Sequence, residues 1–417
     1  MTTINRVNKW LASLRFSAVA AALCCSISAA SQAEQPSKYR LVDLGLVGPA
    51  GQPFDITNNG IIAGAVENPK GTADHAVIYF DQSLINISKP GLGGTNSEAI
   101  GANGWGEVVG GANTPNVDHD AEDFCGFQTT LGIASATESC KPFLWQNGVI
   151  IALPTLDDNH GNNGVAYSIN DRGEVAGAAE NTTLEPGCPA YEPANYQFQQ
   201  YQFKPVVWRH HEAEELATVG GDPVGSAKAV NNSGQAVGAT GTCSVFSLSF
   251  GFPVQPVHAV LWEKDGTPTD LKSLGGNEHS LMGNFAESIN NSGHVVGASS
   301  LSDNVTLHGF FWARETGKMQ DLEPISNTTK ITNSFAIAIN DSDEVVGSSL
   351  DFATQFVATI WKHGVATDLN TLIPANSSLH LMFGCSINSS GEIIGSAADA
   401  KGDLHGYELI PNDQSQW

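Results

Sequence analysis

Positively charged residues are scarce in this sequence. Only 19 Lys and Arg residues stand against 43 Asp and Glu residues, so the formal net charge is −24 over 417 residues. Nucleic acids and anionic membrane surfaces are bound through clusters of basic side chains. The composition therefore predicts no nucleic-acid partner, whereas divalent cations and basic proteins remain compatible with it.

Long apolar runs and local catalytic motifs are also lacking. After residue 33 no stretch approaches the roughly 20 apolar residues that a membrane-spanning helix needs, and no apolar pattern follows the helical period. The sequence contains no Gly-x-Ser-x-Gly elbow, no His-Glu-x-x-His and no phosphate-binding loop. We therefore expect no membrane span, and catalytic residues stay unassigned.

Residues 1–33 have the composition of a secretory signal peptide. Arg6, Lys9 and Arg15 precede an apolar run over residues 16–27, and Ser31-Gln32-Ala33 supplies small residues for cleavage. We expect cleavage after Ala33 and export to the periplasm or the medium. Because the leader contains three basic residues and no acidic one, its removal lowers the formal charge from −24 to −27.

Seven copies of one phrase recur along the remaining chain. Small and branched residues lead into a turn rich in Asn, Asp, Ser and Gly, and a short apolar segment then ends in Gly, as in SINDRGEVAG and SINNSGHVVG. This turn chemistry between two strand-like segments predicts a β-hairpin. The closing glycines are Gly64, Gly110, Gly177, Gly238, Gly297, Gly347 and Gly395.

Each hairpin is followed by two further strand-like segments, such as KPVVW and then EELATV. Four short antiparallel strands per repeat, at a spacing of 46 to 67 residues, predict an all-β, seven-bladed β-propeller that forms a single domain over residues 34–417. The last repeat lacks a fourth strand, while residues 39–45 form a strand without a hairpin. We expect residues 39–45 to complete the last blade and close the ring.

The paired phrases resemble a bacterial family of extracellular repeats, the HAF family, which is named for a His-Ala-Phe tripeptide. The Ile-Asn-x-x-Gly-x-Val-Val-Gly phrase is followed here by His-Ala-Val at 75–77 and 258–260, His-Gly-Phe at 308–310 and His-Gly-Tyr at 405–407. Lys141, Lys204 and Val357 depart from the tripeptide. The resemblance covers nearly all of residues 39–410; it implies an extracellular repeat protein and assigns no catalytic residue.

Three adjacent repeats carry insertions at the same junction. The closing Gly and the aromatic residue of the third strand are 35, 31 and 24 residues apart in repeats two, three and four, against 14 or 15 in repeats one, five and six and 12 in repeat seven. In a propeller this junction lies on the face where one blade connects to the next. We expect the insertions to form a raised wall over one sector, which is where binding residues commonly lie.

The insertion of repeat two is acidic. Asp118, Asp120, Glu122 and Asp123 lie within six positions, together with His119. Oxygen ligands at this density suit a hard cation such as calcium. A solvated acidic loop is the alternative, because the spacing of a calcium-binding loop is absent. Calcium is thus a possible cofactor, and no other is indicated.

The insertion of repeat three is aromatic. Tyr191, Tyr196, Phe198, Tyr201 and Phe203 could stack on sugar rings or fill a pocket of a partner protein. Packing of these rings on one another and on the blade below is the alternative.

Five cysteines follow the leader, and an oxidising compartment favours their pairing. Cys125 and Cys140 lie in one insertion, and Cys188 and Cys243 lie in the insertions of the next two repeats. We expect disulfides between Cys125 and Cys140 and between Cys188 and Cys243. Cys385, in an apolar strand, is expected to be a small buried residue.

Two recurring polar positions are expected to be structural. Asn occupies the hairpin turn in six repeats, as an Asx turn would require. His begins the third strand in four repeats, at His75, His258, His308 and His405, where we expect it to anchor the backbone.

Two functions remain open. The first is an exported, monomeric binding module that takes a glycan or a protein at the insertions of repeats two to four. The alternative is a hydrolase or lyase of polysaccharides or esters, with carboxylates and His from several blades at the mouth of the propeller channel, because such a site leaves no local motif.

Overall fold

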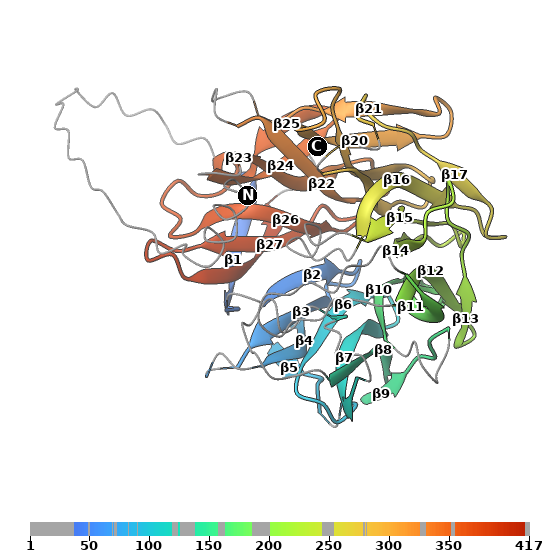
Figure 1. Ribbon diagram of the computed structural model, residues 1–417. Coiled ribbons are helices and arrows are strands. Elements are labelled where there is room, and N and C mark those ends of the chain that lie inside the picture. The colour runs from blue at the N-terminus through green and yellow to red at the C-terminus, as the bar shows by residue number, and fades with distance from the viewer. Residues whose placement is uncertain are drawn as a thin grey trace, which may run out of the picture.

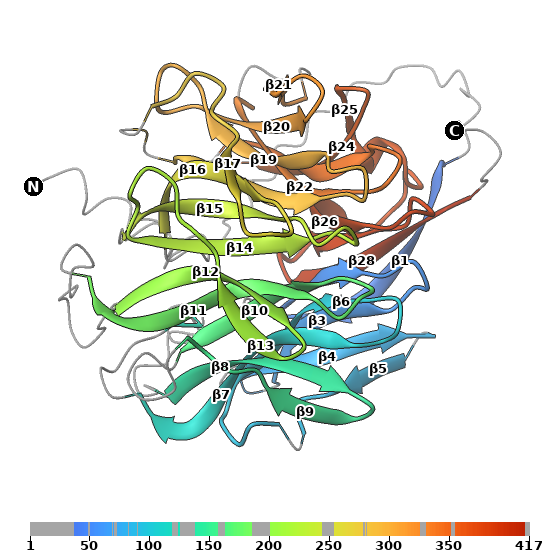
Figure 2. The same cartoon turned by 90° about the vertical axis from the view of Figure 1, so that its right-hand side faces the viewer.

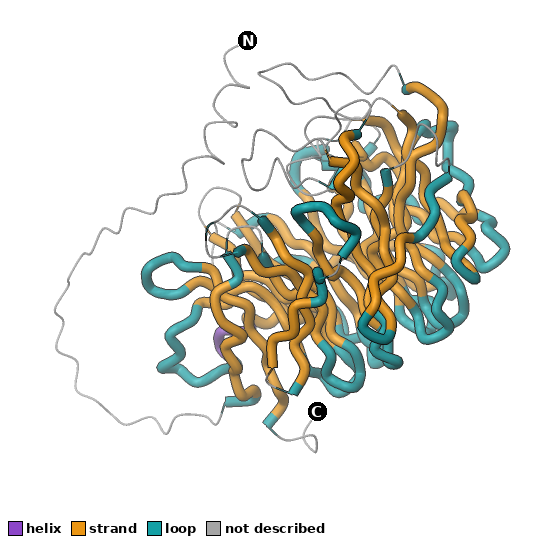
Figure 3. The backbone as a smooth tube through the Cα atoms, turned by 90° about the horizontal axis from the view of Figure 1, so that it is seen from below, coloured by secondary structure: helices purple, strands orange, loops and turns teal. Residues whose placement is uncertain are grey.

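The computed structural model describes residues 37–48, 51–68, 70, 73–81, 83–89, 91–118, 124–125, 138–156, 163–185, 201–243, 254–277, 280, 282–325, 331–351 and 355–412. Strands make up most of these residues, and the short 3₁₀ turn η2 (Leu369–Thr371) is the one helical element among them (Figure 3). No helix in the described part of the chain is long and apolar enough to cross a membrane. The predicted leader, residues 1–33, lies outside the described residues.

Seven antiparallel sheets of four strands follow one another around a ring, as Figure 1 shows. In each of the first six blades the strands are adjacent in chain order, from the innermost to the outermost. The strands of blades one to three are β2 (Gln52–Ile56), β3 (Ile62–Glu67), β4 (Asp74–Phe80) and β5 (Ser83–Asn86); β6 (Ser97–Ala102), β7 (Val108–Val117), β8 (Glu138–Gln146) and β9 (Val149–Ala152); β10 (Gly164–Ile169), β11 (Val175–Leu184), β12 (Tyr201–Arg209) and β13 (Glu212–Glu215).

The remaining blades repeat this order. Their strands are β14 (Val224–Val230), β15 (Ala236–Cys243), β16 (Val254–Trp262) and β17 (Pro268–Asp270); β18 (Asn284–Ile289), β19 (Val295–Ser300), β20 (Leu307–Ala313) and β21 (Lys318–Leu322); β22 (Asn333–Ile339), β23 (Val345–Asp351), β24 (Gln355–Lys362) and β25 (Val365–Asp368); and, in blade seven, β26 (His380–Ile387), β27 (Ile393–Ala398), β28 (Leu404–Pro411) and β1 (Tyr39–Leu46). The prediction of a seven-bladed propeller is confirmed.

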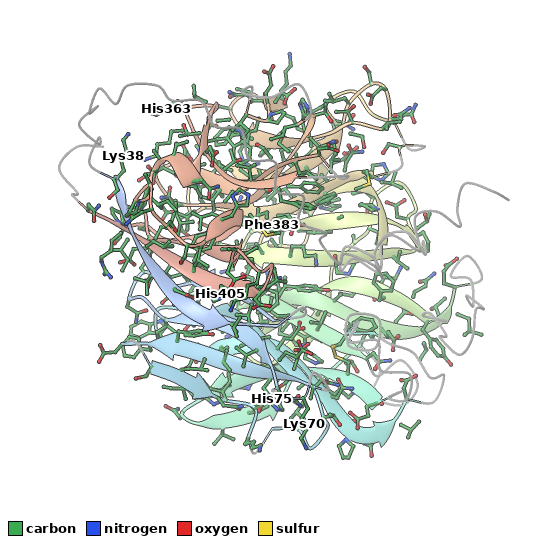
Figure 4. The ribbon with its side chains drawn as sticks, turned by 90° about the vertical axis from the view of Figure 1, so that its left-hand side faces the viewer. Lys38, Lys70, His75, His363, Phe383 and His405 are labelled. Carbon is green, nitrogen blue, oxygen red and sulfur yellow. A yellow bond between two sulfur atoms is a disulfide. The ribbon has the colours of Figure 1, made fainter. Side chains whose placement is uncertain are left out.

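The first described strand closes the ring. β1 pairs antiparallel with β28, from Tyr39 opposite Pro411 to Leu46 opposite His405. Across this pair, Nδ1 of His405 lies 2.9 Å from Oδ1 of Asp43, and Figure 4 shows His405 beside β1. Tyr39 is fully buried in the core of blade seven. The predicted closure by residues 39–45 is confirmed, and it covers the edge of β28, which would otherwise end the blade after three strands.

The closing glycines recur because a carbonyl oxygen of the innermost strand occupies the space beside each of them, and at Gly110, Gly177 and Gly395 an aromatic ring of the third strand lies there as well. A Cβ atom on Gly177 would lie 2.1 Å from the carbonyl oxygen of Val165 in β10 and 2.6 Å from the Trp208 ring in β12. Any side chain would push the innermost strand or the indole aside. At Gly177 the absence of a side chain therefore leaves room for the Trp208 ring beside the second strand.

Tryptophans of the third strands also join neighbouring blades. The indole Nε1 of Trp208 donates to the carbonyl of Pro154, 2.7 Å away in the preceding blade. Trp262 and Trp361 make the same contact with Ala217 and Glu323, at 2.7 and 2.8 Å. Each of these buried rings satisfies its only donor while it fills the space between two sheets.

The turn asparagines form a second connection between blades. In Asn170, Oδ1 accepts hydrogen bonds from the N–H groups of Arg172 and Glu174, which closes its own turn. Its Nδ2 donates to the carbonyl of Asn231 in the next blade at 2.8 Å. Asn103, Asn231, Asn290 and Asn340 bind the next blade in the same way. The expectation that these residues are structural is confirmed.

Candidate functional site

The innermost strand of every blade contains a β-bulge at the same place. Each bulge inserts one residue into the ladder with the second strand, and this residue is half-buried in all seven blades. Because innermost strands surround the axis of the ring, a residue that is bulged out of the ladder and still partly exposed faces that axis. The seven axial residues are Phe54, Ile100, Tyr167, Lys228, Glu287, Ile337 and Cys385.

Three consecutive blades place polar groups at this position. Lys228 of β14 directs Nζ at the ring of Tyr167 in β10, 3.7 Å from its centroid, which is a cation–π contact. Glu287 of β18, in the next blade, interacts electrostatically with Lys228. A phenol, an ammonium and a carboxylate therefore lie in sequence along one side of the axis.

Burial changes the ionisation of all three groups. It lowers the pKa of Lys228 to about 8, against the attraction of Glu287, and it raises the pKa of Glu287 to about 7, against the attraction of Lys228. Burial also raises the pKa of Tyr167, and the negative charges of Glu287 and Glu98 add to that increase. An acid and a base that both titrate near neutral pH are characteristic of functional sites.

The other side of the axis is mostly apolar. Phe54, Ile100, Ile337 and Cys385 occupy the bulge position there, and burial raises the pKa of the Cys385 thiol to about 12, so the thiol stays protonated. Phe383, labelled in Figure 4, lies two residues before Cys385 and packs on Phe356 with ring centroids 5.1 Å apart. The axis thus has one polar and one apolar side.

Blades two to four extend beyond the ring on one face. Their second strands, β7, β11 and β15, contain 10, 10 and 8 residues, against 6 or 7 in the other blades. The ladders to the third strands continue past the core after an irregularity, to Val117 opposite Glu138 and Leu184 opposite Tyr201. Figure 2 shows these three blades as neighbours. The insertions therefore begin on adjacent extended strand pairs, which we call the wall.

The wall contains two of the predicted aromatic residues. Phe203 is fully buried and packs edge-to-face on Phe124, with ring centroids 6.1 Å apart. Tyr201 is half-buried at the outer end of β12. Phe203 thus belongs to the core beneath the wall, and Tyr201 remains accessible. Tyr191, Tyr196 and Phe198 lie outside the described residues.

The acidic insertion is described only at its start. Asp118 is buried, and its Oδ2 accepts a hydrogen bond from Nδ2 of Asn163, 2.9 Å away in the next blade. His119, Asp120, Glu122 and Asp123 lie outside the described residues. Among the residues that are described, no group of three or more His, Cys, Asp or Glu side chains could hold a metal ion.

One predicted disulfide is present. Cys125 and Cys140 are bonded, with Cα atoms 5.9 Å apart, and join the insertion of blade two to β8. Cys188 lies outside the described residues, and so does the side chain of Cys243.

Three of the four third-strand histidines contact carboxylates, whereas His75 has a hydrogen bond with the backbone of Asp74. His258 contacts Asp222 and His308 contacts Asp321, each at 2.8 Å, as His405 contacts Asp43. His308 also contacts the carbonyl of Thr332 at 3.2 Å. These histidines lie on third strands, away from the axis, so they stabilise blades and do not line the axis.

The sequence also contained a signal for the axial residues. Each lies three positions before the turn Asn, or before Thr57 in blade one, within the recurring phrase. This one position varies among Phe, Ile, Tyr, Lys, Glu and Cys. Comparison of the repeats position by position marks this position as variable, but only the three-dimensional ring shows that it faces the axis.

No family model matches the sequence, and no curated protein matches it. Solved structures similar to this chain include an oligogalacturonate lyase from Vibrio parahaemolyticus, at 9% identity over 90% of this chain and 95% of that chain, with a TM-score of 0.46. An oligogalacturonate lyase in complex with manganese is 10% identical over 91% and 95%, with a TM-score of 0.46. TolB from Acinetobacter baumannii is 8% identical over 85% and 64%, with a TM-score of 0.40. These similarities are too weak to carry over a function.

Proposed function

We propose that this protein is a binding module that holds a glycan or a protein against the wall of blades two to four. The observation that carries the proposal is the extension of three adjacent strand pairs beyond the ring on one face. Extra backbone there adds nothing to closure of the propeller, because all seven sheets are complete without it. Rigid strands that present loops are a common arrangement of binding sites.

Apolar side chains at the ends of these strands support the proposal. Val117 and Leu184 occupy matching places on β7 and β11, and they are 74% and 60% exposed. Tyr201 pairs with Leu184. Exposed apolar side chains at corresponding places on neighbouring blades are expected where a partner covers them.

The test removes the insertion of blade three and keeps its base. Because Leu184 and Tyr201 are cross-strand partners, residues 186–200 can be replaced by a short Gly-Ser turn, with Cys243→Ser because Cys188 is lost. We expect the variant to lose at least one of the partners that wild type binds on glycan and cell-surface protein arrays, while its circular dichroism and Tm stay unchanged. Retained binding would overturn the proposal. The matched control shortens the tight turn at residues 315–317 in blade five.

The Lys228–Glu287 pair favours a second candidate, a hydrolase or lyase with its site at the axis. Burial lowers the pKa of Lys228 and raises that of Glu287, so both move toward neutral pH, where a side chain can accept and donate protons. An activity screen on polysaccharides and esters, with and without a chelator, tests it. Turnover that is lost in Lys228→Met would support this candidate, and a negative screen would reject it.

We also propose that the protein is exported and belongs with the extracellular HAF repeats. The leader-like residues 1–33 and the repeat phrases support this proposal, and the Cys125–Cys140 disulfide is typical of oxidising compartments. Sequencing the amino terminus of the protein expressed in a bacterium tests it: a start at Glu34 in the periplasm or medium is expected. An uncleaved cytoplasmic chain would contradict it.

A further inference from the structure

Three neighbouring blades carry polar side chains where the other four carry apolar ones. Tyr167, Lys228 and Glu287 occupy the bulge position of blades three, four and five. We propose that these residues form an axial binding site for a neutral sugar ring. The proposal does not rest on the wall, because the two sites use different residues.

The arrangement of the ring sets these residues opposite apolar ones. Innermost strands contact their neighbours all around the closed ring. With seven blades, blade four lies across the axis from blades seven and one, which place Cys385 and Phe54 at the bulge position. A ligand on the axis therefore meets Lys228 and its neighbours on one side and Phe54 and Cys385 on the other, where the adjacent Asp55 and Ser386 are bound to each other.

Stability alone does not account for the polar side. Replacing a buried ion pair by apolar residues of similar size is often neutral or stabilising. The same fold position is filled by Phe54, Ile100 and Ile337 in other blades, so apolar side chains fit this backbone. Burial lowers the pKa of Lys228 and raises the pKa of Glu287, which means that it disfavours the charged form of each group. Residues that oppose folding in this way are expected where a ligand uses them.

The chemistry of the two sides selects the ligand. An ammonium donates hydrogen bonds, a carboxylate accepts them, and a phenol does both, which suits vicinal hydroxyl groups. The C–H face of a pyranose suits the rings and aliphatic groups opposite. Two carboxylates, Glu287 and Glu98, act on Tyr167 beside the single ammonium of Lys228, so the local charge disfavours an anionic sugar.

Saturation-transfer NMR and calorimetric titration test the inference at neutral pH. The probes are methyl glycosides of glucose, galactose and mannose, together with glucuronate and glucosamine. We expect at least one neutral glycoside to bind, and glucuronate to bind at least about tenfold more weakly. Absence of binding by all three neutral glycosides, or tighter binding of glucuronate or glucosamine, would overturn the inference.

Variants locate the binding. Lys228→Met and Glu287→Gln should each weaken the neutral glycoside at least about tenfold, while Lys401→Met, an exposed lysine on blade seven, should leave it unchanged. The wall variant lacking residues 186–200 should bind the glycoside like wild type, which separates this site from the wall. The Tm of each variant shows whether it folds. Because Lys228→Met and Glu287→Gln are independent, one of them still tests the site if the other does not fold. Wild-type affinity in both folded variants would overturn the inference.

Discussion

Asn388, in the turn of the last blade, donates a hydrogen bond from Nδ2 to the carbonyl oxygen of Thr57 in the first blade, 3.1 Å away and 331 residues distant in sequence. This bond continues the series of turn asparagines across the point where the ring closes. Thr57 has no side-chain amide that could donate to blade two. Nδ2 of Asn59 takes this role and donates to the carbonyl of Gly104, 3.1 Å away. Every blade is thus bound to the next on this face.

Removal of one turn asparagine should therefore destabilise both its own hairpin and a blade junction. Asn388→Ala leaves the N–H groups of Ser390 and Glu392 without their partner and removes one of the two hydrogen bonds that the Thr57 carbonyl accepts, the other coming from Gly60. Because each lost bond costs about 1 kcal/mol, we expect a loss of roughly 2–4 kcal/mol in the free energy of unfolding. Urea denaturation measures it. The control is Asn376→Ala, at an exposed position. An equal loss of stability in both variants would contradict the claim that the turn asparagines stabilise the blade junctions.

Removal of β1 should open the ring. A chain that begins at Gly51 lacks Tyr39, which is buried, and leaves β28 as an exposed edge. We expect this chain to aggregate or to melt at least about 10 °C below a chain that begins at Ser37, by the usual relation between lost stability and Tm. Differential scanning calorimetry and light scattering measure these outcomes. Identical melting of the two chains would show that β1 is dispensable.

His308 should make stability depend on pH through Asp321. Burial opposes the charged imidazole, but the hydrogen bond and charge of Asp321, with the Thr332 carbonyl and Glu323, raise the pKa of His308 above its usual 6.5. The contribution is therefore complete below pH 6.5 and is lost as the pH rises through the raised value. Asp321→Asn should lower the pKa of His308, seen by NMR titration of the imidazole C–H. It should reduce stability in mild acid but not above neutral pH. Asp265→Asn, on an exposed carboxylate, is the control.

Repetition is the reason that the fold could be predicted from the sequence. The hairpin phrase appears in seven copies, with an Asn such as Asn170 in six of them, so a strand that is ambiguous in one copy can be assigned from the others. The fourth strand that is missing from the last repeat matches the unpaired strand at residues 39–45. The closing glycines recur because in every blade a Cβ atom at this position would meet a carbonyl oxygen of the innermost strand.

The axial residues could not be found by the same reasoning. Alternation of side chains along a strand assumes an unbroken ladder, and the bulge at Lys228 breaks it. The residue that faces the axis is therefore the one that a period of two misplaces. Variation at this position also looks like noise until the three-dimensional ring brings Tyr167, Lys228 and Glu287 to one side. In the aromatic insertion, the sequence left ligand binding and packing open as roles of the rings. For Phe203 the structure shows packing, because this ring is buried in the core.

The central claim is that the polar side of the axis is kept for a ligand and at the expense of stability. Its most direct test is the free energy of unfolding of Lys228→Met/Glu287→Leu against wild type, measured by urea denaturation across pH. The folded pKa of Lys228, about 8, lies below the usual 10.5, so the stability present above pH 10.5 is lost as pH falls through 8. The folded pKa of Glu287, about 7, lies above the usual 4.5, so the stability present below pH 4.5 is lost as pH rises through 7.

Both losses act together between about pH 7 and 8, with Tyr167 and Glu98 as the neighbouring titratable groups. We predict that the double variant is more stable than wild type by about 1–4 kcal/mol in this range, and that its advantage shrinks on either side. A double variant that is less stable than wild type at every pH would show that Lys228 and Glu287 hold the ring together, and would contradict the account.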